Sequence, residues 1–292
     1  MTMNDKISDY ITFPRSFENY GWYKAILVFI VAFIITLILT GLTLGVTYLL
    51  LGFDFIKTLF VGGYNALNSP LTIFVSDLCI IVFIPSLYLA SKIVKDRPFS
   101  SYSSSRGGWN FKLYFKALLI PLILYLIYIA IDTAISGPKG TPNLSIEFLL
   151  VLLISVPLQS IAEEYVFRGL FMQTFGSWFK IPLLAIAIQA ILFAIIHGYN
   201  SIGLFEMLCC GLGYGFFAWK TNGIEVSSAL HSVNNFTVGL SIMLGLKTST
   251  SSPQLLDVVG IIVFEIIMFI ILYYVGKRTD WFGEIPENSQ NT

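Results

Sequence analysis

The sequence has few charged residues for its length. Only 12% of its 292 residues are Asp, Glu, Lys or Arg, whereas soluble domains carry about a quarter. Hydrophobic residues make up 56% of the chain, and the mean hydropathy is +0.79. This composition excludes an ordinary soluble domain and indicates a chain that lies in a lipid bilayer. The net charge is zero, so overall charge points to no partner and does not favour nucleic acid.

Cysteine is also scarce. The three cysteines, Cys79, Cys209 and Cys210, lie inside apolar runs and form no CxxC pair. Their spacing argues against a disulfide framework or a zinc ribbon, and it predicts that they are buried by packing.

Long uncharged runs are what the chain has in abundance. The first extends over residues 25–53. Because a signal-peptide core has only about 7–15 residues, this run predicts a retained membrane helix. The sequence as a whole predicts an all-α, polytopic membrane protein. Its eight predicted helices lie near residues 24–50, 71–93, 113–135, 147–174, 182–198, 202–219, 224–246 and 256–275. The alternative count is seven, with the short fifth and sixth segments forming one broken unit.

The basic residues predict the orientation of these helices. With eight spans and an inner N-terminus, 14 of the 17 lysines and arginines lie on the inner side and three, Lys57, Lys139 and Lys247, on the outer. Cytoplasmic loops carry such an excess, so both termini are expected in the cytoplasm. The predicted divisions are an N-terminal tail (1–23), a transmembrane domain (24–276) and a C-terminal tail (277–292). A cell membrane is the expected location, and the short loops are compatible with a bacterial plasma membrane.

Charge appears abruptly in the motif EEYVFR, after an uncharged run over residues 148–162. Ionisable groups at membrane depth are costly, so Glu163, Glu164 and Arg168 are candidate functional residues. Glu164 and Arg168 are four residues apart and can pair on one helix face. Glu163 points about 100° away, which leaves it free for another role. The alternative is a solvated helix end at the cytoplasmic surface.

The chain has only two histidines, and both fall within predicted spans. His197 shares a helix face with Phe193 in FAIIHG, and His231 shares one with Asn235 in HSVNN. A single histidine in an apolar run is more often a packing residue than a catalytic one, but two such histidines favour function. The neighbouring Asn234 is expected to pack or to cap.

The turn between the fourth and fifth predicted helices places two of these motifs at one level. Residue 180 lies midway between Glu163 and His197, and it falls at the expected turn, so the two side chains are predicted to face each other. A buried carboxylate can act as a general base and the imidazole can hold the attacking water. A second histidine with an asparagine can donate hydrogen bonds to an oxyanion. This set suits hydrolysis of an amide or ester without a serine or cysteine nucleophile.

The three motifs EExxxR, FxxxH and HxxxN, in this order on membrane helices, resemble the CAAX protease and bacteriocin-processing family of intramembrane glutamic endopeptidases, the Abi or Rce1-like family. The resemblance covers about residues 145–247. It implies that Glu163 activates water, that His197 holds this water, and that His231 and Asn235 form the oxyanion site. It further implies that Glu164 and Arg168 position their helix, with Phe193 as part of the second motif.

The same resemblance implies a membrane-associated peptide or protein as substrate and no cofactor. Eukaryotic members remove the last three residues of prenylated proteins. Bacterial relatives are associated with bacteriocin immunity, peptide-pheromone processing and regulation of surface proteins.

Three other interpretations remain open at this stage. Glu163, His197 and His231 could be the three protein ligands of a catalytic zinc ion, although the chain has no HExxH motif. The polar residues could instead form the network of a non-catalytic scaffold or immunity protein that binds a partner. In a transporter, intramembrane acids relay protons. The further acids are Glu206 and Glu265, expected deep in the membrane, and Asp77, Asp132 and Asp257, expected near span ends.

Overall fold

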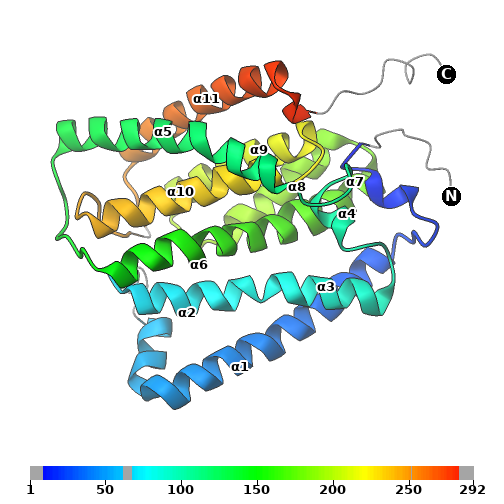
Figure 1. Ribbon diagram of the computed structural model, residues 1–292, viewed down its shortest axis with the longest axis horizontal. Coiled ribbons are helices and arrows are strands. Elements are labelled where there is room, and N and C mark those ends of the chain that lie inside the picture. Colours follow the sequence, from blue (N-terminus) through cyan, green and yellow to red (C-terminus); the bar gives the residue numbers. More distant parts are fainter. Residues whose placement is uncertain (1–8, 62–67, 251, 283–292) are drawn as a thin grey trace.

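The computed structural model describes residues 9–61, 68–250 and 252–282. This part of the chain is a bundle of helices, and its only β-type pairing is an isolated bridge between Ser104 and Gly223 (Figure 1). The helices are α1 (Lys24–Val61), α2 (Pro70–Ile81), α3 (Phe83–Val94), α4 (Ser100–Ser103), α5 (Phe111–Ser136), α6 (Ile146–Glu164), the π-helix η3 (Tyr165–Met172), α7 (Gln173–Phe179), α8 (Pro182–Ile195), α9 (Ser201–Lys220), α10 (Glu225–Met243) and α11 (Leu255–Arg278), with short 3-10 helices η1 (Phe13–Ser16) and η4 (Asp280–Phe282).

Every predicted membrane segment is helical, but the described residues contain six helices that are long and apolar enough to cross a membrane. These are Lys24–Val61, Pro70–Val94, Phe111–Ser136, Ile146–Phe179, Ser201–Lys220 and Leu255–Arg278. α8 is apolar but shorter. α10 carries serines, asparagines and a histidine, and most of it is buried among other helices, so it need not be apolar. An all-helical, multi-pass membrane protein is confirmed, and the count of eight crossings stays a prediction.

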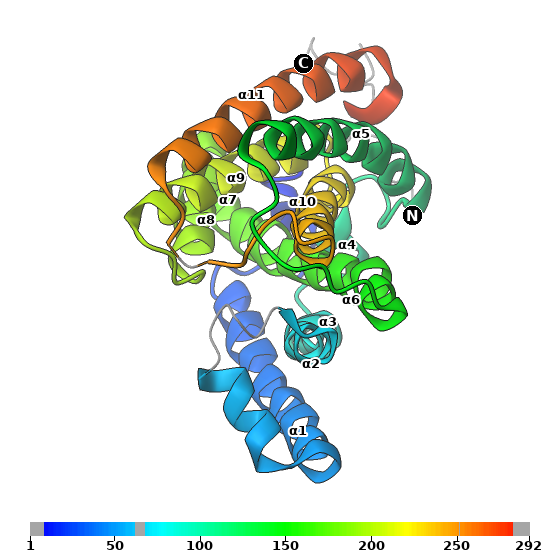
Figure 2. The same cartoon turned by 90° about the vertical axis from the view of Figure 1, so that its left-hand side faces the viewer.

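α10 is the central helix of the bundle. It packs against α5, α6 and α9, and Figure 2 shows it between α5 and α6. α2 and α3 cover the other side of α6, and α1 packs on α2 and α3 at the edge of the bundle. α6 and α10 both carry predicted site residues, so their direct contact brings these motifs together.

Both ends of the described chain meet at one side chain. Asn222, in the turn after α9, accepts a hydrogen bond from the Tyr10 backbone N–H at 3.4 Å and donates one to the Phe282 carbonyl at 3.3 Å. The two ends therefore lie at the same end of the bundle, which fits an even number of crossings. The membrane side on which they lie remains a prediction, as do the tail boundaries; residues 1–8 and 283–292 of those tails lie outside the described residues.

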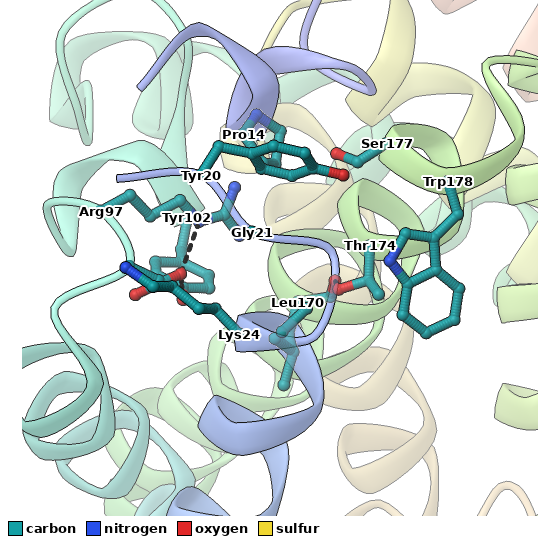
Figure 3. A pocket seen from close by; sticks show the side chains of 12 residues that line it. Pro14, Tyr20, Gly21, Lys24, Arg97, Tyr102, Leu170, Thr174, Ser177 and Trp178 are labelled. Carbon is teal, nitrogen blue, oxygen red and sulfur yellow. Dashed lines mark hydrogen bonds and ion pairs between the residues drawn. The ribbon is translucent and has the colours of Figure 1, made fainter. Parts of the chain in front are cut away.

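Part of the predicted N-terminal tail packs on the bundle. Tyr10 and Ile11 are fully buried, and the Tyr10 hydroxyl donates to the Tyr102 carbonyl at 2.7 Å. Burial raises the pKa of Tyr10 well above its ordinary range, so the phenol stays a neutral donor. A small pocket beside this segment is lined by Tyr20, Arg97 and Trp178, among others (Figure 3). Its lining includes none of the predicted catalytic residues.

The close approach of η3 to the segment around α4 depends on a glycine. A Cβ at Gly169 would lie 2.9 Å from the Tyr102 carbonyl oxygen, nearer than ordinary packing allows. Gly169 follows Arg168, and its own carbonyl accepts a hydrogen bond from Arg97 at 3.2 Å. The glycine thus lets this end of the bundle pack directly on the charged motif.

We expect Gly169→Ala to destabilise the protein by about 1–3 kcal/mol, because the added methyl group must displace backbone. Thermal unfolding of the purified protein in detergent measures this. Gly41→Ala in α1 is the matched control, since a Cβ there meets nothing within 4 Å and alanine favours a helix. Equal unfolding temperatures for the two variants would contradict the packing account.

Candidate active site

The charged motif lies where the backbone changes its winding. α6 ends at Glu164, and the next eight residues, Tyr165–Met172, form the π-helix η3. Such π-helical turns are rare and frequently mark functional sites. Glu163 and Glu164 therefore stand at the junction of two helical forms, in the interior of the bundle.

Glu164 and Arg168 form a fully buried ion pair. Arg168 Nη1 lies 2.7 Å from Glu164 Oε1, and neither side chain is exposed to solvent. Arg168 Nη2 also donates to the Gly211 carbonyl of α9 at 3.2 Å. Its guanidinium lies 4.6 Å from the centre of the Phe193 ring and 5.4 Å from that of Tyr214. The predicted pairing within EEYVFR is present, and the arginine ties η3 to α9.

His231 lies between the two carboxylates. Its Nδ1 is 3.0 Å from Glu164 Oε1, and its Nε2 is 3.6 Å from Glu163 Oε2. The His231 ring stacks on the Tyr214 ring, with 5.3 Å between the ring centroids. It forms a T-shaped contact with the Phe193 ring, with 5.6 Å between the centroids. Because a carboxylate only accepts hydrogen bonds, Nδ1–H donates to Glu164 and Nε2 faces Glu163. The sequence predicted separate partners for the two glutamates, whereas one imidazole contacts both.

The two oxygens of Glu163 have different surroundings. Oε1 accepts a hydrogen bond from Gln159 Nε2 at 2.6 Å. Oε2 has no hydrogen-bond partner among the described residues, and it faces His231. Glu163 is 7% exposed, whereas Glu164 is fully buried. One oxygen is thus held in place, and the other remains available to accept a proton.

His197 follows the end of α8, beyond the last helical residue Ile195. Its Nδ1 lies 2.6 Å from the Phe193 carbonyl. Since a carbonyl only accepts, Nδ1–H is the donor and Nε2 keeps its lone pair. The ring is half-buried and within electrostatic range of Glu163 and His231. The predicted turn is confirmed, because α7 ends at Phe179 and α8 begins at Pro182.

Asn235 lies four residues after His231 on α10, which is one helical turn. Its Nδ2 donates to Gln159 Oε1 at 3.1 Å and to Ser160 Oγ at 3.3 Å. The neighbouring Asn234 accepts a hydrogen bond from the Tyr125 hydroxyl at 3.0 Å. It is therefore a bonded member of the same polar region, beyond the packing or capping role expected of it.

Two residues of the site were missed from the sequence. Gln159 precedes Glu163 by four residues in a run that is otherwise mostly apolar, so the helical spacing that paired Glu164 with Arg168 could have found it. Tyr214 gave no such signal, because the chain has fifteen tyrosines. Only the packing of α9 on α10 shows that its ring supports His231.

The three aspartates that were predicted near span ends have two kinds of surroundings. Asp132 and Asp257 pair with Lys247 and Lys139 at helix ends, at 3.4 and 3.8 Å, as expected for interfacial residues. Asp77 was predicted to lie at a membrane interface near a span end. Its side chain is instead buried where α2 packs on α6. Ser155 Oγ donates to its carboxyl at 2.7 Å, a partner on another helix that the sequence of α2 alone could not reveal.

A metal site was one alternative drawn from the sequence. Among residues 9–61, 68–250 and 252–282, no group of three or more His, Cys, Asp or Glu side chains is placed to hold a metal ion. Glu163, His197 and His231 are not gathered in this way.

The region that contains these residues is similar to a known protein family. Residues 145–237 match the model of a family described as type II CAAX prenyl endopeptidase Rce1-like. The chain is also similar to the uncharacterized protein YyaK of Bacillus subtilis (strain 168), with 29% identity over 183 residues. That match covers 58% of this chain and 61% of the relative, less than two thirds of its length. No solved structure matches the chain.

The buried ion pair leads to a stability prediction. Arg168→Met leaves the Glu164 carboxylate without its arginine, so we expect a loss of about 3–5 kcal/mol. The double variant Glu164→Gln/Arg168→Met removes both charges and should recover part of that loss. Unfolding of the detergent-solubilised variants measures both. A double variant no more stable than Arg168→Met would contradict the pairing.

Proposed function

Residues 145–237 match the model of the type II CAAX prenyl endopeptidase Rce1-like family, and from this match we propose that the chain is an intramembrane endopeptidase. It hydrolyses a peptide bond of a membrane-associated peptide or protein by means of a water molecule activated by Glu163. One observation carries the proposal: Glu163 presents one unbonded carboxylate oxygen toward His231, inside a bundle of membrane-length helices, while its other oxygen is held.

The proposed reaction begins with proton transfer from water to Glu163 Oε2 as the water oxygen attacks the substrate carbonyl carbon. Gln159 fixes the carboxylate through Oε1. His197 Nε2 has a lone pair that can accept the second hydrogen of the water and so orient it. Collapse of the tetrahedral intermediate breaks the C–N bond, and Glu163 returns the proton to the leaving amine. No covalent enzyme intermediate is formed.

His231 and Asn235 form the proposed oxyanion site. They stand one turn apart on α10 and both carry N–H donors. Asn235 donates to both Gln159 and Ser160 in the substrate-free protein, so the oxyanion would take over the hydrogen that Ser160 accepts. Glu164 and Arg168 keep His231 in position.

The substrate class follows from where the site lies. A buried site within membrane helices meets chains that are embedded in the bilayer or anchored to it. Similarity to a bacterial protein supports a bacterial plasma membrane as the location. Processing of bacteriocins or peptide pheromones and regulation of surface proteins are the proposed physiological settings.

The test uses the full-length protein in liposomes with a synthetic library of lipid-anchored peptides. We expect Glu163→Gln to lower cleavage about 10²–10⁴-fold, because an amide cannot take the proton. Mass spectrometry of the new termini measures the product. Glu147→Gln is the matched control, since Glu147 is an exposed acid in the first turn of the same helix.

Cleavage should also persist in a chelator. Full cleavage by Glu163→Gln would place the base elsewhere. Loss of wild-type cleavage in chelator would move the site to the metalloproteases. A wild-type protein that cleaves no member of the library, together with a cellular phenotype that Glu163→Ala leaves intact, would favour a scaffold.

A further inference from the structure

Glu265 of α11 is a buried acid that the proposed reaction does not use. It is 2% exposed, and within the described part of the chain it forms no ion pair with a basic residue. Its neighbours are the Tyr125 hydroxyl, 3.2 Å from Oε1, and the Cys210 thiol, 3.3 Å from Oε1 and 3.4 Å from Oε2. A buried carboxylate without a cation is costly, which favours the neutral acid.

A chain of hydrogen bonds connects Glu265 with Glu163. The Tyr125 hydroxyl donates to Asn234 Oδ1 at 3.0 Å. Asn234 Nδ2 donates to Asn235 Oδ1 at 3.2 Å, and Asn235 Nδ2 donates to Gln159 Oε1 at 3.1 Å. Gln159 Nε2 then donates to Glu163 Oε1 at 2.6 Å. The chain crosses from α11 through α5 and α10 to α6.

All these bonds run in the same direction, toward Glu163. Each amide accepts through its oxygen and donates through its nitrogen to the next residue. Tyr125 has a single hydroxyl hydrogen, and in this arrangement Asn234 receives it. The contact between Tyr125 and Glu265 is then a hydrogen bond only if Glu265 is the donor. The other oxygen of Glu265 remains free to accept the Cys210 thiol hydrogen.

The opposite arrangement leaves the half-buried Asn234 without a donor for its side-chain oxygen. If Glu265 were ionised, Tyr125 would donate to it, and Asn234 Oδ1 would lose its donor. A polar atom that loses its hydrogen-bond partner inside a helix bundle destabilises that arrangement. With the neutral acid, Asn234 keeps the Tyr125 hydroxyl as its donor, and Tyr125 accepts a hydrogen bond from Glu265.

We propose that Glu265 is a protonated positioning residue, and that it acts through Tyr125 and Asn234 to orient the amides that hold Glu163. The amide of Gln159 could otherwise rotate and present its oxygen to the carboxylate. A chain with one direction prevents this, because Gln159 Oε1 is engaged by Asn235. Hydrogen bonds in series also polarise one another and strengthen the last donor. The catalytic part of this inference rests on the proposed function.

The protonation of Glu265 can be measured without any substrate. The infrared difference spectrum between wild type and Glu265→Gln at neutral pH should show the loss of a carboxylic-acid C=O band. Glu147→Gln, which changes an exposed carboxylate of α6, should show no such loss. Loss of a carboxylate band in Glu265→Gln instead would overturn the proposal.

The positioning role is measured by the cleavage assay. Tyr125→Phe breaks the chain, so kcat should fall about tenfold with KM unchanged, the effect of roughly one hydrogen bond. Glu265→Leu should cause the same fall in kcat with KM unchanged. Glu265→Gln should recover most of the rate, because its amide N–H can still donate to Tyr125. A role that needs an ionised carboxylate predicts no such recovery.

Tyr128→Phe is the matched control. Tyr128 and Tyr125 both lie on α5 and both pack on Phe264, with 4.6 and 4.8 Å between the ring centroids. The Tyr128 hydroxyl is not a member of the hydrogen-bond chain. This variant should cleave at the wild-type rate. Adding Tyr125→Phe to Gln159→Leu should cause no further loss, because the chain is already broken at Gln159.

The outcomes separate this inference from the proposed function. Wild-type cleavage with an undiminished Tyr125→Phe rate would overturn the positioning role and leave the peptidase proposal intact. A wild-type protein without cleavage would overturn the peptidase proposal and the positioning role with it, and the infrared measurement would still decide whether Glu265 is protonated.

Discussion

The buried pair of Glu164 and Arg168 is the interaction on which the candidate site depends. Either charge alone at this depth would be too costly to keep. Together they connect four elements, α6, η3, α9 and α10, because Arg168 also bonds the Gly211 carbonyl of α9 and Glu164 bonds His231 of α10. The cost of placing charge in the bundle is offset by this pairing, and the pairing fixes the position of an imidazole beside Glu163.

The site combines one carboxylate that is paired with an arginine and one that is not. Each has one oxygen without a hydrogen-bond partner, but Glu164 Oε1 is engaged by Arg168 and His231, whereas Glu163 Oε1 is held by the uncharged Gln159. The difference arises from neighbouring residues on α6 and η3. Gln159 is four positions before Glu163, and Arg168 is four positions after Glu164. Adjacent glutamates thereby acquire different chemistry within one turn, which is what a general base next to a structural ion pair requires.

Much of this arrangement could be predicted from the sequence, since polar residues stand out in apolar runs. Helical spacing gave the Glu164–Arg168 pair, and the position of Lys180 gave the turn between α7 and α8. Spacing within a helix cannot show which neighbouring helix a face meets. For this reason the contact of His231 with both carboxylates was missed, and so was the burial of Asp77 against Ser155. The chain from Glu265 to Glu163 crosses four helices, so no local pattern could have shown it.

The central claim is that water attacks the substrate directly, and trapping in isotopically labelled water tests it most directly. Cleavage in H₂¹⁸O with hydroxylamine present should give a carboxylate product that carries ¹⁸O and no hydroxamate, because no acyl-enzyme exists for the amine to intercept. A hydroxamate product would contradict the account, since it would require a covalent intermediate on a nucleophilic side chain.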